Sequence, residues 1–378
     1  MADVADAGPV SLLYRDRDGR IDGIGDYCEG LESALRATGV DARIVSWRGR
    51  GIDVNEGAVI LQYNPFSFGR WGFAPRLAID MRRLARRQPQ VRRAMMVHEA
   101  FVPIDSAKTL VMGTWQRLQL RALLLTVDVV MVTTSSWIRL LPPACGATAI
   151  PVGSNLPDRR DRREQSRRAL GADEDAVVLA SFGSDHPSFL LEYVVGAANA
   201  VAAARGSVKL LCLGAGTRPV TGLDARVELH RPGTQSSDEL ATGLSACDIY
   251  LSPFSDGLST RRTTLMAALQ HGLPVVGTYG SRTEPELRRE DRAIHWTPAA
   301  DPSSFAHSAI DMADNAGRRH QCAAAARELY DRAFAWDLIA RRVLAAVASP
   351  PQSPPQRGAV NKRAGRALWC RQHEPDDP

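Results

Sequence analysis

The sequence of 378 residues is poor in lysine, and this limits how it can bind phosphate groups. Lysine occurs only at Lys108, Lys209 and Lys362, so nearly all of the 47 Lys and Arg residues are arginine. A phosphate group must therefore be held by arginine side chains or by backbone N–H groups.

The sequence also lacks the features of a metal site, a disulfide framework or a membrane span. The six cysteines form no CxxC pair, and Cys212 and Cys247 lie in apolar segments typical of buried free thiols. No segment approaches the roughly 18 apolar residues of a spanning helix. Residues 1–10 lack the basic start and apolar run of a signal peptide. We therefore expect a cytoplasmic protein.

The charge is too small to indicate nucleic-acid binding. The formal net charge is +5, and aromatic residues do not alternate with the basic ones. One basic segment has apolar residues at helical spacing, namely Leu77, Met81 and Leu84. This segment is usually a solvated surface, but it is also compatible with peripheral contact with an anionic membrane or a phosphorylated acceptor. Its cations are Arg82, Arg83, Arg86, Arg87, Arg92 and Arg93.

With 44% hydrophobic and 24% charged residues, the chain has the composition of a globular protein, and its length exceeds what one core usually fills. Short apolar runs alternate with helical patterns, which predicts parallel sheets covered by helices. In the first half we expect strands at residues 10–14, 42–47, 58–62, 93–98, 127–133 and 148–151. The helices expected there are residues 25–38, 74–87 and 108–126.

A second α/β series follows the charged segment 159–168. We expect strands at 176–182, 208–214, 226–230, 249–253 and 274–278, and helices at 188–205, 237–246, 258–271 and from 302 onward. The predicted organisation is a first domain at 1–152, a linker at 153–168, a second domain at 169–333, a helix at 334–348 and a proline-rich tail at 349–378.

Two glycines, Gly23 and Gly25, follow the first strand and open the first helix. A helix N-terminus favours an anion, and glycine allows a phosphate to approach closely. The spacing is not GxGxxG, so a plain turn is the alternative interpretation.

A histidine and a carboxylate, His98 and Glu99, end a buried strand at the edge where open α/β sheets bind ligands. A neutral imidazole there can orient a hydroxyl group or donate to a sugar. The alternative is a structural histidine at a strand end.

The segment 252–264, SPFSDGLSTRRTT, is the most informative one. We expect Ser259 to cap a helix whose first turn contains Arg261 and Arg262. Two cations there oppose the helix dipole, and a bound diphosphate would reverse that cost. Asp256 and Gly257 belong to the same loop. A solvated turn is the alternative.

Two further loops follow strands of the second half. Gly183 ends the first of these strands, and Arg231 follows a later one, where a base or ribose could be contacted. Each loop alone is a weak signal, and a plain turn is the favoured interpretation for the Arg231 loop. His186 and His230 are compatible with purely structural roles.

Taken together, GIGDY, MVHE, IPVGSNLP and PFSDGLSTRR followed by ALQHGLPVV resemble the group 1, family 4-like retaining glycosyltransferases of GT-B fold. The resemblance spans residues 8–347. It implies two Rossmann-like domains that face each other across a cleft, a last helix that crosses back, and a nucleotide-sugar donor as co-substrate with no other cofactor. The acceptor would be a small molecule, a lipid-linked molecule or a glycan.

Carried over by position, the resemblance places Gly23, Gly25, Gly183, Arg231, Gly257, Ser259, Arg261 and Arg262 in donor binding. It places His98 and Asp256 at the transferred sugar. The acceptor hydroxyl would attack from the face that the nucleotide leaves, without a metal ion. The hydroxyl proton would pass to a donor phosphate oxygen.

The chain departs from the family at the two glutamates before its GxPVV motif, where Ser259 and Ala267 stand. The usual basic pair after Gly183 is also missing. The resemblance therefore implies a divergent subgroup. A GT-B epimerase and a catalytically inactive scaffold protein remain alternatives; a phosphorylase with a pyridoxal-bearing lysine is disfavoured by the scarcity of lysine.

Overall fold

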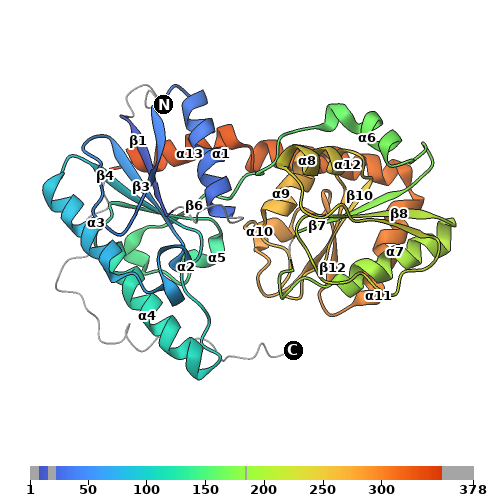
Figure 1. Cartoon of the computed structure of the whole chain (residues 1–378), viewed down its shortest axis with the longest axis horizontal. Helices are drawn as coiled ribbons and strands as arrows, with labels where there is room; N and C mark the ends of the chain where they lie inside the picture. The colour runs from blue at the N-terminus through green and yellow to red at the C-terminus, as the bar shows by residue number, and fades with distance from the viewer. Residues whose placement is uncertain (1–7, 16–22, 184, 351–378) are drawn as a thin grey trace.

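The computed structural model describes residues 8–15, 23–183 and 185–350, which contain two six-stranded sheets (Figure 1). The strand order is β2-β1-β3-β4-β5-β6 in the first sheet and β12-β11-β10-β7-β8-β9 in the second. Neighbouring strands within each sheet run parallel. The predicted pair of parallel-sheet α/β units is confirmed.

The first sheet is covered by helices on both faces. Leu12 and Ile60 pack in one core with α1 and α13, whereas Leu13 and Leu61 pack in a second core with α3 and α4. The strands are β1 (Val10–Tyr14), β2 (Ala42–Ser46), β3 (Ala58–Tyr63), β4 (Arg92–Val97), β5 (Val129–Val132) and β6 (Thr148–Ala149). The helices are α1 (Gly23–Ala37), α2 (Pro65–Phe68), α3 (Pro75–Arg87), α4 (Ala107–Leu124) and α5 (Ser135–Ile138).

The second sheet is built in the same way. Helices α7 and α11 share a core on one face, and α8, α9 and α12 pack on the other. The strands are β7 (Val178–Phe182), β8 (Val208–Leu213), β9 (Val227–His230), β10 (Ile249–Ser252), β11 (Val275–Tyr279) and β12 (Ile294–Pro298). The helices are α6 (Arg163–Ala169), α7 (Leu191–Arg205), α8 (Ser237–Ser245), α9 (Thr263–Gln270), α10 (Pro285–Arg288), α11 (Pro302–Asp314) and α12 (Ala316–Ala333).

The last helix, α13 (Trp336–Ala348), returns to the first sheet and packs against α1 (Figure 1). Its first residue, Trp336, lies between Gly30 and Gly153, where an added Cβ would be 2.5 and 2.6 Å from the indole ring. The indole Nε1 donates to the carbonyl of Ser154 at 2.6 Å. Only glycine at positions 30 and 153 leaves room for the indole ring. Trp336 thus holds the segment around Ser154, which connects the two sheets.

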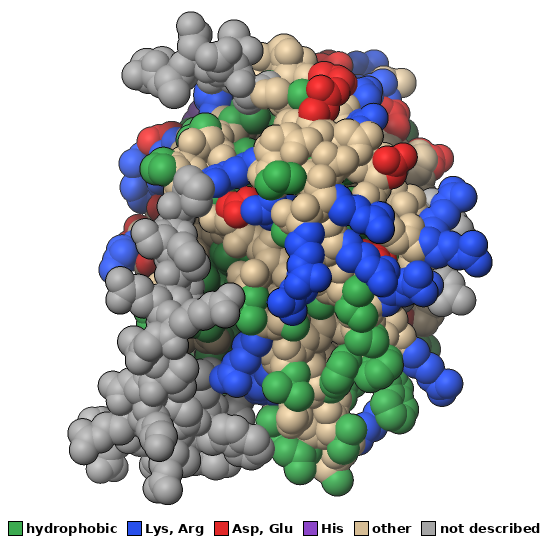
Figure 2. Space-filling model, turned by 90° about the vertical axis from the view of Figure 1, so that its left-hand side faces the viewer, with side chains coloured by type: hydrophobic (Ala, Val, Ile, Leu, Met, Phe, Trp, Pro, Cys, Tyr) green, Lys and Arg blue, Asp and Glu red, His purple; other side chains and the backbone are tan. Residues whose placement is uncertain are grey.

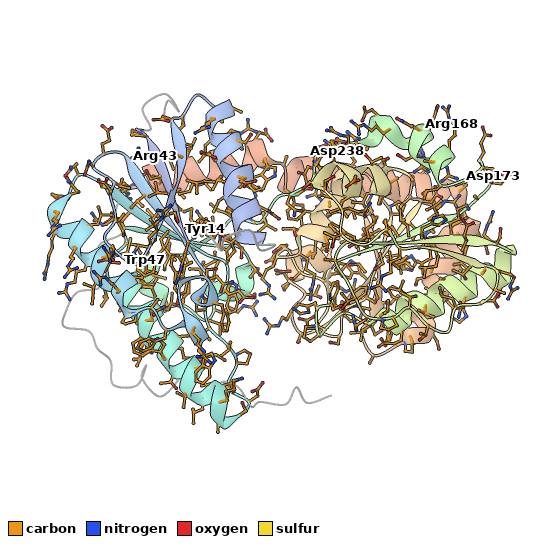
Figure 3. The ribbon with its side chains drawn as sticks, viewed as in Figure 1. Tyr14, Arg43, Trp47, Arg168, Asp173 and Asp238 are labelled. Carbon is orange, nitrogen blue, oxygen red and sulfur yellow. The ribbon has the colours of Figure 1, made fainter. Side chains whose placement is uncertain are left out.

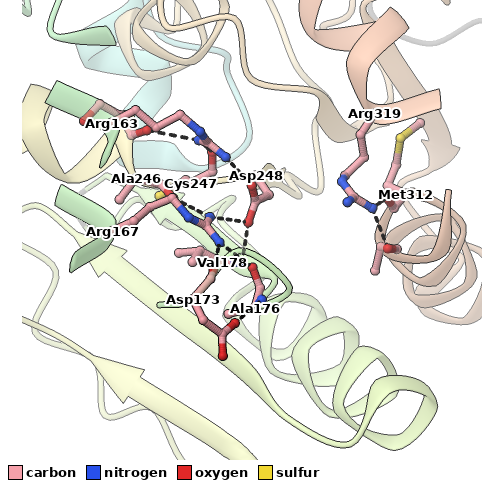
Figure 4. A network of polar contacts seen from close by, with 12 residues as sticks. Arg163, Arg167, Asp173, Ala176, Val178, Ala246, Cys247, Asp248, Met312 and Arg319 are labelled. Carbon is pink, nitrogen blue, oxygen red and sulfur yellow. Dashed lines mark hydrogen bonds and ion pairs between the residues drawn. The ribbon is translucent and has the colours of Figure 1, made fainter. Parts of the chain in front are cut away.

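The charged segment 159–168, part of the predicted linker, contains most of α6. Asp248 explains why, because Arg163 and Arg167 both bind its carboxylate, Arg167 at 2.9 Å (Figure 4). Asp238 on α8, labelled in Figure 3, accepts from Arg159 at 2.6 Å and Arg162 at 2.7 Å. These ion pairs attach the segment to the second domain.

The predicted domain bounds stay predictions, since the first sheet ends at Ala149 and the second begins at Val178. Of the predicted tail, residues 351–378 lie outside the described residues. None of the helices in the described ranges is long and apolar enough to cross a bilayer.

Candidate active site

A cavity of about 430 Å³ lies between the two domains. From the first domain it is lined by Gly23, His98 and Thr133, among others, and from the second by Gly183, Arg261 and Arg262. Most of these residues follow the carboxyl end of a strand, which is the ligand-binding edge of open α/β sheets.

His98 directly follows β4 and is 9% exposed. Its Nε2 lies 2.9 Å from Oε1 of Gln62, and its ring meets that of Tyr27 edge-on with centroids 4.8 Å apart. Burial lowers the pKa of His98 to about 3. The imidazole is therefore neutral at physiological pH and suited to orienting a hydroxyl group rather than to binding a phosphate.

Arg262 is held by three groups of its own domain. Its guanidinium lies 2.8 Å from Asp256 and 3.2 Å from the hydroxyl of Ser188, and its centre is 3.4 Å from the centroid of the Phe254 ring. Burial lowers the pKa of Arg262 to about 10, so it remains a cation at neutral pH. Its Nε has no hydrogen-bond partner among the described residues.

Arg261 reaches across to the first domain. Its Nη1 is 3.7 Å from Oε1 of Glu99, and its guanidinium lies 5.9 Å from the centroid of the Trp137 ring. Burial lowers the pKa of Arg261, while the charge of Glu99 raises it. The two arginines thus put two positive charges on one wall of the cavity.

The predicted start of the helix after these arginines is wrong. Helix α9 begins at Thr263, with Arg262 rather than Ser259 at the N-cap position and no side-chain cap. The reason is a set of long-range bonds: Leu258 donates to the carbonyl of Thr278 at 2.9 Å, and the N–H of Thr260 binds Glu284. Arg261 and Arg262 therefore lie just before the helix and not in its first turn.

The remaining predicted residues are divided between the cavity and its surroundings. Gly23 is the first residue of α1, and an added Cβ at Gly23 or Gly183 would meet no atom within 4 Å. Asp256 binds Arg262 and lies 3.6 Å from Arg282. Five predicted residues do not line the cavity, namely Gly25, Arg231, Asp256, Gly257 and Ser259. Their roles stay predictions.

Arg231 is hydrogen-bonded to backbone outside the cavity lining, and Ser259 is buried. The guanidinium of Arg231 donates to the carbonyl oxygens of Arg218, at 2.8 Å, and of Gly216, so it braces a loop. Ser259 is 2% exposed. His186, for which the sequence left a structural role open, lines the cavity, and its Nδ1 lies 2.8 Å from the hydroxyl oxygen of Ser188.

The sequence indicated no role for Tyr27, which lines the cavity, or for Glu284, which lies outside the lining. The hydroxyl of Tyr27 is buried without a hydrogen-bond partner among the described residues, beside His98. Glu284 is 3% exposed and contacts both domains. The described residues contain no group of three or more His, Cys, Asp or Glu side chains placed to hold a metal ion.

Comparison with known proteins gives a partial family match and a shared fold. Residues 176–315 match the family model described as Glycosyl transferases group 1. WaaG, a glycosyltransferase involved in lipopolysaccharide biosynthesis, superposes with a TM-score of 0.62 at 13% identity, over 90% of this chain and 100% of that one. Among curated protein sequences, none matches.

Two other solved structures have the same architecture. HepE of Anabaena, in complex with UDP-glucose, gives a TM-score of 0.60 at 12% identity over 89% of this chain and 99% of that one. Sucrose-phosphate synthase from Thermosynechococcus elongatus gives 0.61 at 15% identity over 89% and 97%. The chain therefore has the GT-B fold, and its residues 176–315 match the group 1 glycosyltransferase model.

Proposed function

We propose that this protein transfers a glycosyl group from a nucleotide-sugar donor to a hydroxyl acceptor. The observation that carries the proposal is the pair Arg261 and Arg262 on one wall of the cavity, opposite His98 on the other. Arginine is suited to a diphosphate because its planar guanidinium can donate two parallel hydrogen bonds. The UDP-glucose bound to HepE is a donor of this class.

In the proposed reaction the bond between the anomeric carbon and the diphosphate breaks, and a bond to the acceptor oxygen forms on the same face. The hydroxyl proton passes to a phosphate oxygen of the leaving nucleotide. Arg261 and Arg262 stabilise the charge that develops on that diphosphate, which is the role given to a metal ion elsewhere. Neutral His98 positions the sugar or the hydroxyl group, and closure of the domains excludes water.

A second candidate function is that of a catalytically inactive GT-B protein that acts as a scaffold. One observation favours it: the two positions where the family has glutamates, Ser259 and Ala267, are 2% and 0% exposed and lie outside the cavity lining. Neither position offers a carboxylate to a ligand.

We also propose that the first domain binds an anionic membrane, where a lipid-linked acceptor would lie. Of the charged residues, 12 of the 47 Lys and Arg but only 4 of the 42 Asp and Glu lie between residues 65 and 140. All the exposed large hydrophobic residues among the described ones fall between Trp71 and Leu140. Figure 2 shows hydrophobic and basic side chains gathered on this end of the molecule. Two of these 12 cations, Arg92 and Arg93, do not belong to this surface, because they bind the carbonyl of Val347 and the carboxylate of Asp128, which leaves ten.

The donor site is tested by a thermal-shift screen with UDP, GDP, dTDP, ADP and their sugars, since a ligand that binds only the folded state raises the melting temperature. The variant Arg261→Ala with Arg262→Ala should lose the shift. Arg341→Ala with Arg342→Ala, on α13 and outside the cavity lining, is the matched control and should keep it. The absence of any shift in the native protein would favour the scaffold function.

A further inference from the structure

Glu284 is a buried carboxylate that binds groups of both domains. It precedes α10 in the second domain and is 3% exposed. From its own domain it accepts the hydroxyl of Thr260 at 2.8 Å and the N–H of Thr260 at 3.1 Å. From the first domain it accepts the hydroxyl of Thr134.

The partners of Glu284 adjoin the two walls of the cavity. Thr260 directly precedes Arg261 and Arg262, and Thr134 directly follows Thr133, which lines the cavity. The hydroxyl of Thr133 lies 3.4 Å from the carbonyl of His98. One carboxylate is therefore linked to the arginines on one side and, through Thr133 and Thr134, to His98 on the other.

Burial of the Glu284 carboxylate costs free energy, and the hydrogen bonds from Thr260 and Thr134 together offset that cost. A buried carboxylate is strongly destabilising unless hydrogen bonds replace its lost water. Glu284 obtains one of those bonds from the opposite domain, so its burial depends on how the two domains meet. The charge of Glu284 also acts on Arg261, where it favours the cationic form.

We propose that Glu284 is a positioning residue of the transfer reaction, which fixes the separation between the arginine pair and His98 by holding Thr260 and Thr134 on one carboxylate. The inference rests on the proposed function for its catalytic meaning. Apart from catalysis, a change at Thr134 in the first domain should alter residues 258–264, the segment that contains Arg261 and Arg262 in the second domain. Thr134 itself is not part of the cavity lining.

The first experiment measures hydrogen exchange of residues 258–264 in the ligand-free native chain and in Thr134→Val. This variant keeps the shape of Thr134 and removes the hydroxyl that binds Glu284. We expect exchange of the segment to become about ten-fold faster, because a hydrogen bond to a charged group contributes roughly 1.5–3 kcal/mol. Thr134 also caps α5, but that effect is confined to peptides near residues 134–138.

The controls separate this link from general loosening of the interface. Ser135→Ala removes an exposed contact of 3.3 Å with Glu286. This contact joins α5 and α10, the helices that directly follow Thr134 and Glu284, and its loss should leave the exchange of 258–264 unchanged. Thr134→Ser, which keeps a hydroxyl, should restore native exchange. Unchanged exchange in Thr134→Val overturns the proposal even if the protein binds no nucleotide.

The second experiment measures the affinity for UDP, or for whichever nucleotide stabilises the native chain most. Thr134→Val and Glu284→Gln should each weaken binding by about ten-fold. The double variant should bind no more weakly than Glu284→Gln alone, because both changes act on the same hydrogen bond between Thr134 and Glu284. Additive losses would overturn the proposal. Failure of the native chain to bind any nucleotide would instead contradict the proposed function and leave the exchange result to decide the role of Glu284.

Discussion

Asp256 and Arg262 form an ion pair of 2.8 Å within one loop, in which the Arg262 side chain is 13% exposed and that of Asp256 is 21% exposed. The same guanidinium stacks on Phe254 and leaves its Nε without a partner among the described residues. Arg262 is thus oriented by groups of its own domain while it lines the cavity, although its Nε is itself buried. That combination fits a side chain prepared for an anionic ligand.

Asp256→Asn should lower the free energy of unfolding by about 2 kcal/mol, because it leaves the poorly solvated Arg262 without its counter-charge. A diphosphate can take the place of the lost carboxylate, so the nucleotide should raise the melting temperature of this variant more than that of the native protein. Guanidinium unfolding and thermal shift, with and without nucleotide, measure the two effects.

The matched control is Asp337→Asn on α13, whose ion pair with Arg341 is 64% and 58% exposed. Such a surface pair contributes less than about 0.5 kcal/mol. Equal stability of Asp256→Asn and the native protein would show that Asp256 does not hold Arg262.

His98 should make stability depend on pH. Burial lowers its pKa to about 3 in the folded protein, against roughly 6.5 when unfolded. Between these values the unfolded chain binds a proton that the folded chain does not, so the free energy of unfolding falls as the pH falls below about 6.5. The slope is about 1.4 kcal/mol per pH unit.

His98→Gln should lack this part of the slope. Denaturant unfolding at several pH values between 7 and 4 gives both profiles, and other buried histidines such as His271 contribute equally to each, so the difference isolates His98. Parallel profiles would mean that the pKa of His98 is the same in the folded and the unfolded protein.

The sheets were largely predictable from sequence because their strands are buried. All six residues of β3, for example, are buried, and the first four are a continuous apolar run. This strand was placed at 58–62 and observed at Ala58–Tyr63. Parallel strands buried on both faces have this pattern. β12 was missed, because only two of its five residues are fully buried and it contains no continuous apolar run.

The site was predictable where it depends on strand ends and unpredictable where it depends on the meeting of two domains. Gly23, His98, Gly183, Arg261 and Arg262 line the cavity because each follows a strand in the expected order. The bonds that displace the start of α9 join residues 20 and 24 positions apart, Leu258 to Thr278 and Thr260 to Glu284. No local pattern records such contacts, and Glu284 was missed for the same reason.

Gly257→Ala should destabilise the protein by about 2 kcal/mol or more. Gly257 has φ +84°, and an added Cβ would lie 2.3 Å from the backbone nitrogen of Gly280 and 2.4 Å from Oγ1 of Thr283. The substitution would therefore push the loop that contains Arg261 and Arg262 away from residues 280–284, which include Glu284. Denaturant unfolding measures the change.

The comparison variant is Gly196→Ala, in the middle of α7, where an added Cβ would meet no atom within 4 Å. Alanine is favoured over glycine in a helix, so this variant should be more stable by about 0.5–1 kcal/mol. If both substitutions stabilised the protein, the tight packing of Gly257 against Gly280 would be wrong.

The membrane proposal predicts binding to vesicles that contain phosphatidylglycerol and little binding to phosphatidylcholine alone. Trp71 is 53% exposed and Phe73 is 56% exposed. Trp71 is the non-glycine residue with positive φ, 58°, among the described ones, and its carbonyl accepts from Gln116 at 3.1 Å. The protein thus holds an aromatic side chain in water on a backbone conformation that costs free energy, which is typical of functional sites.

Two sets of variants divide the apolar and charged contributions to vesicle binding. Trp71→Ser with Phe73→Ser should weaken sedimentation with phosphatidylglycerol vesicles at all salt concentrations, since buried apolar area drives that part. Serine at Arg82, Arg83, Arg86 and Arg87 should weaken it by about 1 kcal/mol per arginine and remove most of the salt dependence. Arg168→Ser, an exposed arginine of the second domain, should bind like the native protein. Equal sedimentation of all variants, or of the native protein with both kinds of vesicle, would show that this surface does not bind anionic lipid.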